Sequence, residues 1–295
     1  MTKIETVGVV GAGLMGGGIA QVAATAGFPV IVRDIDDGAI AKGRAAIEKS
    51  LGKFVEKGKL AAADRDAALG RLTFTTDLAA MADRDLVIEA VPEVLELKNT
   101  LWRELDSLCQ ADTIFASNTS SLTIAAMAAV TKRRDRFVGL HFFSPVPLMP
   151  LVEVVRTVGT KPAVFDAAFQ FGKAIGKEPI AAKDSAGFVV NLLLVPYMLD
   201  AIRQLERGVA SVEDIDKGMK LGCGHPMGPF TLLDFTGLDI CYNVAEIMFA
   251  EFRETRYAPP PLLKRLILLG HLGRKTGRGF YDYSGPTPVP AELGI

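Results

Sequence analysis

Cysteine, histidine and tryptophan are scarce in this chain of 295 residues, which has three cysteines, three histidines and one tryptophan. The cysteines, Cys109, Cys223 and Cys241, lie far apart, with no C-x-x-C pair and no spacing typical of a metal site. Their odd number and separation argue against a disulfide scaffold and against a zinc site, and favour a reducing compartment. We therefore predict a protein without a bound metal.

The chain also lacks a large excess of either charge and long apolar runs. The 33 Lys and Arg residues nearly balance the 34 Asp and Glu residues, so we expect no general attraction to nucleic acid or to an anionic membrane. The longest apolar run is interrupted by Asn191 and Pro196 and does not reach a membrane-spanning length. The first strand-like segment begins almost at Met1, which leaves no room for a signal or transit peptide. The sequence thus predicts a cytoplasmic protein.

A glycine-rich run near the N-terminus is the most informative feature that is present. Residues 11–16, Gly-Ala-Gly-Leu-Met-Gly, follow an apolar segment at 6–10 and open a helix-like segment at 18–24. Asp34 ends a second apolar run, eighteen residues after Gly16. Strand, glycines, helix, strand and acid in this order are the fingerprint of a Rossmann-type dinucleotide-binding fold.

Each part of the fingerprint has a physical reason. Gly11 permits a tight turn, Gly13 lets the backbone approach a pyrophosphate, and Gly16 lets the helix pack closely on the sheet. Asp34 is expected to accept hydrogen bonds from the ribose hydroxyls and to repel a 2′-phosphate, which favours NAD over NADP. A glycine turn without a ligand and a flavin site are the alternatives. The predicted cofactor residues of this segment are Gly11, Gly13, Leu14, Met15, Gly16 and Asp34.

The chain divides into two parts of different character. Strand-like and helix-like segments alternate up to about residue 184, and the remainder reads as mainly helical. We predict an α/β Rossmann-type domain with a doubly wound, mostly parallel sheet over residues 1–184. An all-α domain over residues 185–295 is predicted to follow, with its first helix, at 188–207, as a core helix. A cleft between two domains is the expected place for a ligand.

Hydride transfer from an alcohol requires a base for the hydroxyl proton, and histidine is the usual choice at neutral pH. His141 ends a predicted strand, at the sheet edge where ligands of open α/β folds bind. His225 lies in a Pro/Gly turn and His271 follows Gly270. Position therefore favours His141 as the base, with a buried structural histidine as the alternative.

Two polar residues interrupt apolar segments. Glu153 lies within the apolar strand 151–155, where a carboxylate is costly without a partner, and a neighbouring histidine strand could supply one. The alternative places Glu153 on an exposed face of the strand. Asn191 lies in the apolar run 188–195 and either satisfies a backbone group or donates to a substrate oxygen.

Residues Ser117 to Ser121 follow a predicted strand end, so their hydroxyl groups should face the expected cleft. The alternative is that they form an N-cap for a helix beginning near Leu122.

These segments together resemble the L-3-hydroxyacyl-CoA dehydrogenases, especially the short-chain 3-hydroxybutyryl-CoA type, over nearly the whole chain. The stretches that carry the resemblance are the glycine run 11–16, Asp34, and residues 85–90, 116–122, 141–143, 151–154, 187–191, 225–229, 237–239 and 272–281.

The resemblance implies a role for each matching residue. It implies a catalytic His141–Glu153 pair, with Ser120 and Asn191 contacting the 3-oxygen and thioester region of the substrate. Glu93, Asn118 and Ser120 fall where the family approaches the nicotinamide side of NAD, and Lys98 is a further position expected to bind NAD. Lys53 and Lys57, four residues apart on one helix face, fall where family members hold CoA, with an ordinary solvated lysine face as the alternative.

The implied function is the reversible oxidation of a (S)-3-hydroxyacyl-CoA by NAD⁺, in fatty acid or butanoate metabolism, by a homodimer. Ser144, Pro150 and Leu192 depart from the common pattern of the family, which bears on the preferred acyl group. Two alternatives remain at this point. One is a dehydrogenase of a CoA-free hydroxy acid, such as a sugar acid or a carnitine-like compound. The other is an NAD-binding protein without catalytic activity.

Overall fold

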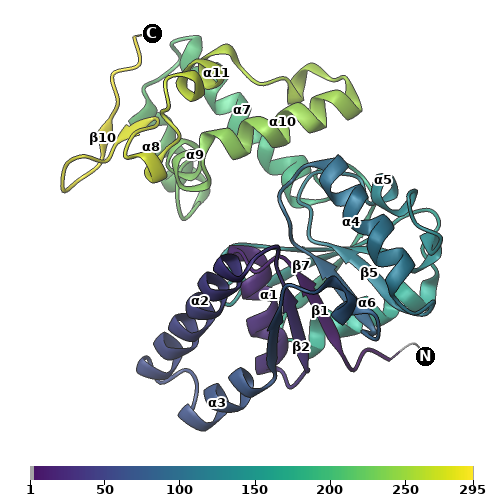
Figure 1. The fold of residues 1–295 in the computed structure, drawn as a ribbon. Helices are drawn as coiled ribbons and strands as arrows, with labels where there is room; N and C mark the ends of the chain where they lie inside the picture. Colours follow the sequence, from purple (N-terminus) through teal and green to yellow (C-terminus); the bar gives the residue numbers. More distant parts are fainter. Residues whose placement is uncertain (1–2, 295) are drawn as a thin grey trace. The chain divides into compact units, whose positions relative to one another are not determined.

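The computed structural model describes residues 3–294, which form two compact units. The first unit ends at Phe188 and the second begins at Val189 (Figure 1). The division lies four residues after the boundary predicted at residue 184. In the described residues no helix has the length and the apolar composition that a membrane crossing requires.

The first unit contains a sheet of eight strands in the described residues. Their order across the sheet is β3-β2-β1-β4-β5-β6-β7-β8, and the neighbouring strands are parallel except for the pair β6 and β7. The strands are β1 Val7–Val10, β2 Val30–Arg33, β3 Leu72–Thr75, β4 Leu86–Glu89, β5 Ile114–Ser117, β6 Phe137–Phe142, β7 Leu151–Arg156 and β8 Glu178–Lys183. The predicted doubly wound, mostly parallel sheet is confirmed.

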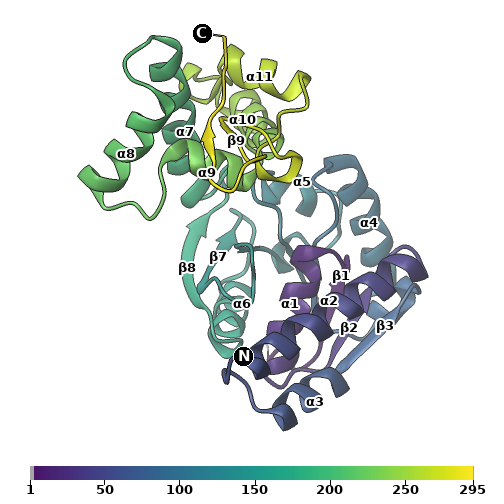
Figure 2. The same ribbon diagram turned by 90° about the vertical axis from the view of Figure 1, so that its left-hand side faces the viewer.

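Helices cover both faces of this sheet (Figure 2). The helices of the first unit are α1 Leu14–Thr25, α2 Asp37–Glu56, α3 Ala62–Gly70, α4 Leu95–Leu108, α5 Ile124–Ala128 and α6 Pro162–Ala174, with short 3-10 turns at Leu78–Met81 and Arg134–Arg136. Side chains of α1, α2, α3 and α6 join the apolar cluster on one face, and those of α4 and α5 join the cluster on the other.

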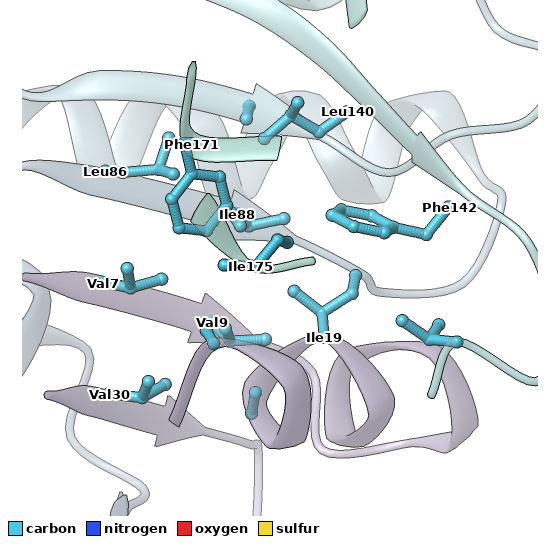
Figure 3. Close-up of a cluster of buried hydrophobic side chains, with 14 of the residues drawn as sticks. Val7, Val9, Ile19, Val30, Leu86, Ile88, Leu140, Phe142, Phe171 and Ile175 are labelled. Carbon is cyan, nitrogen blue, oxygen red and sulfur yellow. The ribbon is translucent and has the colours of Figure 1, made fainter. Parts of the chain in front are cut away.

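Apolar strands without alternation produce these two cores, because a parallel sheet is buried on both faces. In Figure 3, Val9 of β1 lies close to Ile19 of α1, and Val7 belongs to the same cluster. Phe142 extends from β6 into the same cluster, and Phe171 joins it from α6. The second cluster is centred on Trp102, whose ring centroid lies 4.9 Å from that of Phe115 and 4.7 Å from that of Phe137. The sheet is therefore packed between two apolar layers.

The helix predicted to begin near Leu122 begins instead at Ile124, and its cap comes from a distant residue. The Asp184 carboxylate accepts hydrogen bonds from the N–H groups of Ile124 and Ala125, both at 2.7 Å. The alternative interpretation, in which residues 117–121 cap this helix, therefore does not hold. A carboxylate sixty residues further along the chain gives no local sequence signal.

The second unit is helical, as predicted. Its helices are α7 Val190–Glu206, α8 Val212–Cys223, α9 Pro229–Thr236, α10 Leu238–Phe252 and α11 Pro261–Leu268, with 3-10 turns at Thr255–Tyr257 and Arg274–Thr276 and a short hairpin of β9 Tyr281–Asp282 and β10 Val289–Pro290. Helix α7 buries one face only, since Val195, Leu199 and Ile202 are buried while Leu193 is 67% exposed. The predicted core helix is therefore buried along one face, and its first turns are partly exposed.

Two buried carboxylates organise the second unit. Asp216 of α8 accepts hydrogen bonds from the N–H groups of Phe230 and Thr231, and thereby caps the start of α9. Asp234, at the end of α9, accepts from the N–H groups of Phe280 and Tyr281 and holds the C-terminal hairpin against the helices. Burial and the charge of Asp216 raise the pKa of Asp234 above its ordinary value.

Candidate active site

The glycine run forms the turn between β1 and α1, as the fingerprint predicts. Gly11 has a φ of +107°, and a Cβ there would lie 2.6 Å from the Ala90 carbonyl oxygen. A Cβ on Gly16 would lie 1.8 Å from the Gly11 carbonyl oxygen. Both positions therefore require glycine for the fold itself, because no side chain could be accommodated.

Gly13 differs from its two neighbours in the run, because a Cβ there would meet no atom within 4 Å. It is exposed, and it is the N-cap of α1 without a side chain that caps the helix. The first N–H groups of α1 are thus available to an anion, and the exposed Leu14 and half-buried Met15 follow them. This open backbone cradle fits the pyrophosphate of a dinucleotide.

Asp34 lies directly beside this turn, at the carboxyl end of β2. Its Oδ2 accepts a hydrogen bond from the Ala12 N–H at 2.6 Å, and its Oδ1 accepts from the Ile35 N–H at 2.6 Å. The carboxylate therefore fixes the glycine loop as well as ending the strand. Each oxygen keeps a second lone pair, which suits the predicted contact with ribose hydroxyls.

His141 and Glu153 lie opposite each other on neighbouring strands. Because β6 and β7 are antiparallel, His141 pairs in register with Glu153, and both side chains point to the same face of the sheet. The His141 Nδ1 atom is 2.5 Å from Glu153 Oε2. His141 is 5% exposed and Glu153 is fully buried. The structure thus brings together the two residues that the sequence analysis pairs.

This arrangement determines what the imidazole can do. An ionised carboxylate only accepts hydrogen bonds, so the proton of neutral His141 is on Nδ1 and the Nε2 lone pair remains available. The rings of Phe143 and Phe188 lie with their centroids 4.5 and 5.7 Å from that of His141. Such a buried imidazole, held by a carboxylate, is suited to take up a proton and to keep its new charge stabilised.

The loop after β5 connects this pair to the rest of the sheet edge. The Asn118 side-chain oxygen accepts a hydrogen bond from the Phe142 N–H at 3.0 Å, next to His141 in the chain. The Ser120 N–H donates to Glu93 Oε1 at 3.1 Å. Asn118, Ser120 and Glu93 therefore lie at the same carboxyl edge as the histidine, where open α/β sheets bind ligands.

Glu93 and Lys98 form part of a network of charges at this edge. The Lys98 ammonium lies 3.1 Å from Glu93 Oε2, and Thr119 and Ser121 donate their hydroxyl hydrogens to Glu93 Oε1. Burial disfavours the ionised form of Glu93, but Lys98 and these hydrogen bonds outweigh it and hold the pKa of Glu93 below its ordinary value. Glu93 is therefore an anion at neutral pH.

Lys98, which we predicted as a cofactor-binding residue, is buried beneath Glu93 rather than exposed to a ligand. Its side chain is 1% exposed, and its ammonium donates to Glu89 and to the Val91 carbonyl oxygen besides pairing with Glu93. All three N–H groups are thus engaged within the protein. Glu89 is a functional candidate that the resemblance does not indicate, although a carboxylate at the end of the apolar strand 86–89 is a signal of the same kind as Glu153.

Comparisons with known proteins identify the family of this chain. Sequence profiles for the NAD-binding domain and the C-terminal domain of 3-hydroxyacyl-CoA dehydrogenase match residues 6–185 and 187–283. The chain belongs to the 3-hydroxyacyl-CoA dehydrogenase family. It is accordingly an NAD-dependent oxidoreductase of fatty acid metabolism, and the alternatives of a flavin site, a ligand-free glycine turn and a CoA-free substrate are set aside.

Individual relatives of this 3-hydroxyacyl-CoA dehydrogenase are similar over nearly their whole length. The 3-hydroxybutyryl-CoA dehydrogenase of Mycobacterium tuberculosis is 51% identical over 95% of this chain and 99% of the relative. The human mitochondrial hydroxyacyl-coenzyme A dehydrogenase is 47% identical over 95% of this chain and 91% of its own. The crystal structure of (S)-3-hydroxybutyryl-CoA dehydrogenase PaaH1 from Ralstonia eutropha has a TM-score of 0.93, with 46% identity, and the match covers 96% of this chain and 100% of that one.

The remaining predicted residues lie on other elements than the His141 group. Lys53 and Lys57 are exposed at the C-terminal end of α2. Lys53 lies about 24 Å along the helix axis from Asp37, the first residue of the helix. Asn191 belongs to the second unit, in the first turn of α7. His225, also in the second unit, has its Nδ1 atom 3.3 Å from the Tyr197 hydroxyl.

Proposed function

We propose that this dehydrogenase interconverts (S)-3-hydroxybutyryl-CoA and acetoacetyl-CoA, with His141 as the general base and acid. The observation that carries the proposal is the buried His141–Glu153 pair at 2.5 Å, on the same sheet edge as the exposed Gly13 cradle. The short acyl chain is supported by the names of the relatives from Mycobacterium tuberculosis and Ralstonia eutropha.

In the oxidative direction, the Nε2 atom of His141 takes the proton of the 3-hydroxyl group. The Nδ1–H group of the resulting imidazolium donates to Glu153 Oε2, and the buried carboxylate stabilises the positive charge. Ser120 holds the 3-oxygen during the reaction, and Asn191 supplies a further donor to the substrate. NAD⁺, when bound, supplies the hydride acceptor. In the reductive direction, the protonated His141 returns the proton to the same oxygen.

The cofactor site that we propose follows the glycine turn and the sheet edge. Gly13 and the first N–H groups of α1 bind the pyrophosphate, and Asp34 accepts from the adenosine ribose. Glu93 and Asn118 lie on the nicotinamide side. Glu93 has a side chain that is 32% exposed and can reach a ligand directly, whereas Lys98 acts through it.

We further propose that Lys53 and Lys57 bind the phosphates or the adenine end of CoA. Both are exposed, which leaves their ammonium groups accessible to an anionic ligand. The charge reversal Lys53→Glu with Lys57→Glu should raise KM for acetoacetyl-CoA by roughly an order of magnitude at low salt, and leave the affinity for NADH unchanged.

The deciding experiment follows NADH oxidation with acetoacetyl-CoA and, in parallel, with free acetoacetate. We expect rapid turnover with the thioester only, and a much slower reaction when NADPH replaces NADH. Turnover of longer 3-ketoacyl-CoA thioesters in preference to acetoacetyl-CoA would overturn the short-chain assignment. Turnover of the free acid would overturn the CoA assignment.

We also propose that the protein is a cytoplasmic homodimer that pairs through its helical unit. Several large apolar side chains of that unit are exposed and support this, because exposed apolar surface commonly marks an interface between proteins: they are Leu193, Leu221, Phe235, Ile240, Leu268 and Leu269. Sedimentation equilibrium should give twice the 31.5 kDa of the single chain, and a single-chain mass at micromolar concentration would refute the dimer.

A further inference from the structure

Glu89 is buried at the carboxyl end of β4 and has no role in the proposed reaction. It is 0% exposed. Its carboxylate accepts hydrogen bonds from the Lys98 ammonium at 2.5 Å, the Ser117 hydroxyl at 2.6 Å and the Val91 N–H at 2.8 Å. A group without exposed surface does not touch a ligand, so any effect of Glu89 on the reaction passes through these partners.

Lys98 is the partner that leads from Glu89 to the ligand side. Its ammonium lies between Glu89 Oε1 at 2.5 Å and Glu93 Oε2 at 3.1 Å. Two carboxylates thus share one ammonium, and the three groups together carry one net negative charge. Glu93 is the member that reaches the surface, so the surplus charge is presented there.

Stability alone does not account for this arrangement. A buried ion pair contributes little to folding compared with apolar residues of the same volume, because desolvation of both charges offsets their attraction. The pair also leaves Lys98 without any N–H group for a ligand. What Glu89 changes is the charge that the site presents, since without it Lys98 would neutralise Glu93 fully.

We propose that Glu89 is a positioning residue that makes the site favour the oxidised cofactor: as the second counter-ion of Lys98, it leaves the Glu93 charge uncompensated at the sheet edge. The inference rests on the proposed function, in which Glu93 lies on the nicotinamide side. The ring of NAD⁺ carries a positive charge that NADH lacks, so a surplus negative charge stabilises the oxidised form selectively.

The test compares the dissociation constants of NAD⁺ and NADH in wild type and in Glu89→Gln, by NADH fluorescence titration and by competition with NAD⁺. The substitution keeps the size of the side chain and removes its charge. We expect the dissociation constant of NAD⁺ to rise roughly tenfold and that of NADH by less than about threefold, the size of effect that one charge has at about 10 Å in a partly solvated site. The ratio of the two constants cancels any general weakening of the fold.

Asp106→Asn is the matched control. Asp106 forms a second buried ion pair of the same unit, with Arg133 at 2.7 Å, and lies eight residues beyond Lys98 along α4, about 12 Å along the helix axis. This variant should lower the melting temperature without cofactor as Glu89→Gln does, while the ratio of the two dissociation constants stays at the wild-type value.

The outcomes separate the inference from the proposed function. A shifted ratio in Glu89→Gln and an unchanged one in Asp106→Asn supports the inference. An unchanged ratio in Glu89→Gln overturns it and makes Glu89 purely structural. If Glu93→Gln also leaves the ratio unchanged, the placement of Glu93 in the proposed function is wrong as well.

Should Glu89→Gln not fold, the double variant Glu89→Gln/Lys98→Gln replaces it. This variant removes both buried charges and leaves the net charge of the group at one negative unit, through Glu93. A ratio within about twofold of wild type supports the inference, and a shift of about fivefold or more overturns it.

Discussion

At the scale of single residues, the chemistry depends on one imidazole whose two nitrogen atoms have separate tasks. The Nδ1 atom of His141 is held by Glu153 at 2.5 Å, so Nε2 is left for the substrate proton. Replacing His141 by Asn removes the base and leaves the glycine turn intact. We expect kcat for acetoacetyl-CoA reduction to fall about a thousandfold or more, while the dissociation constant for NADH stays within about twofold of wild type.

Steady-state rates and NADH fluorescence titration check this prediction. Glu153→Gln is the companion variant, because it retains the side-chain size but cannot stabilise the imidazolium, and kcat should fall by about two to four orders of magnitude. A His141→Asn variant that retains more than about a tenth of wild-type turnover would contradict the assignment of the base.

The glycines of the cofactor turn give a second prediction at the residue scale. Gly13→Ala should leave the melting temperature nearly unchanged, because the new methyl group meets no atom within 4 Å, but should weaken NADH binding about tenfold or more by blocking the approach of the pyrophosphate. Gly16→Ala should instead destabilise the fold by several kcal/mol, since its Cβ would lie 1.8 Å from the Gly11 carbonyl oxygen.

Thermal unfolding without cofactor and NADH titration separate the two variants. Equal losses of stability in Gly13→Ala and Gly16→Ala would contradict the prediction, because they would mean that a side chain is as costly to the fold at Gly13 as at Gly16.

At the scale of elements, the loops after β4 and β5 are joined by the Glu93 carboxylate. Burial alone would raise the pKa of Glu93, but the attraction of Lys98 and hydrogen bonds from Thr119 and Ser121 hold the pKa below its ordinary value of 4.5. A carboxyl group of this kind stabilises the fold fully above its ordinary pKa, and the contribution disappears as the pH falls through the lowered value.

Wild type should therefore lose stability between about pH 5 and pH 3 more steeply than Glu93→Gln, which has no carboxyl group to protonate at this position. Denaturant unfolding at several pH values measures both slopes. Parallel slopes would mean that the Glu93 carboxylate does not stabilise the folded state.

The elements also show what the sequence could and could not predict. Glu153 and His141 each attract notice as polar residues in apolar strands, and the family resemblance pairs them. Their contact, however, depends on the reversed direction of β7, a property of the sheet topology that no local pattern encodes. The burial of Lys98 could not be predicted either, because a lysine is expected at the surface by default. Its burial is explained by the two carboxylates around it, Glu89 and Glu93.

At the scale of the whole molecule, each unit has a core of its own. We therefore expect two transitions in calorimetry, and NADH should raise only the transition of the first unit, which holds the glycine turn. At a hundred times its dissociation constant, NADH should stabilise that unit by about 2.7 kcal/mol. A single transition that shifts as a whole would show that the units unfold cooperatively.

The strand reversal at β6 and β7 has a consequence for how such an enzyme can diversify. The ladder between these strands fixes His141 opposite Glu153, whereas the connecting segment 143–150 lies outside the paired residues. Insertions or deletions in that segment can reshape what surrounds the substrate without shifting the register of the proton-transfer pair. A one-residue slip within either strand would instead turn one of the two side chains to the opposite face. Substrate range and acid–base chemistry can thus be inherited separately, although only eight residues, 143–150, connect the two strands.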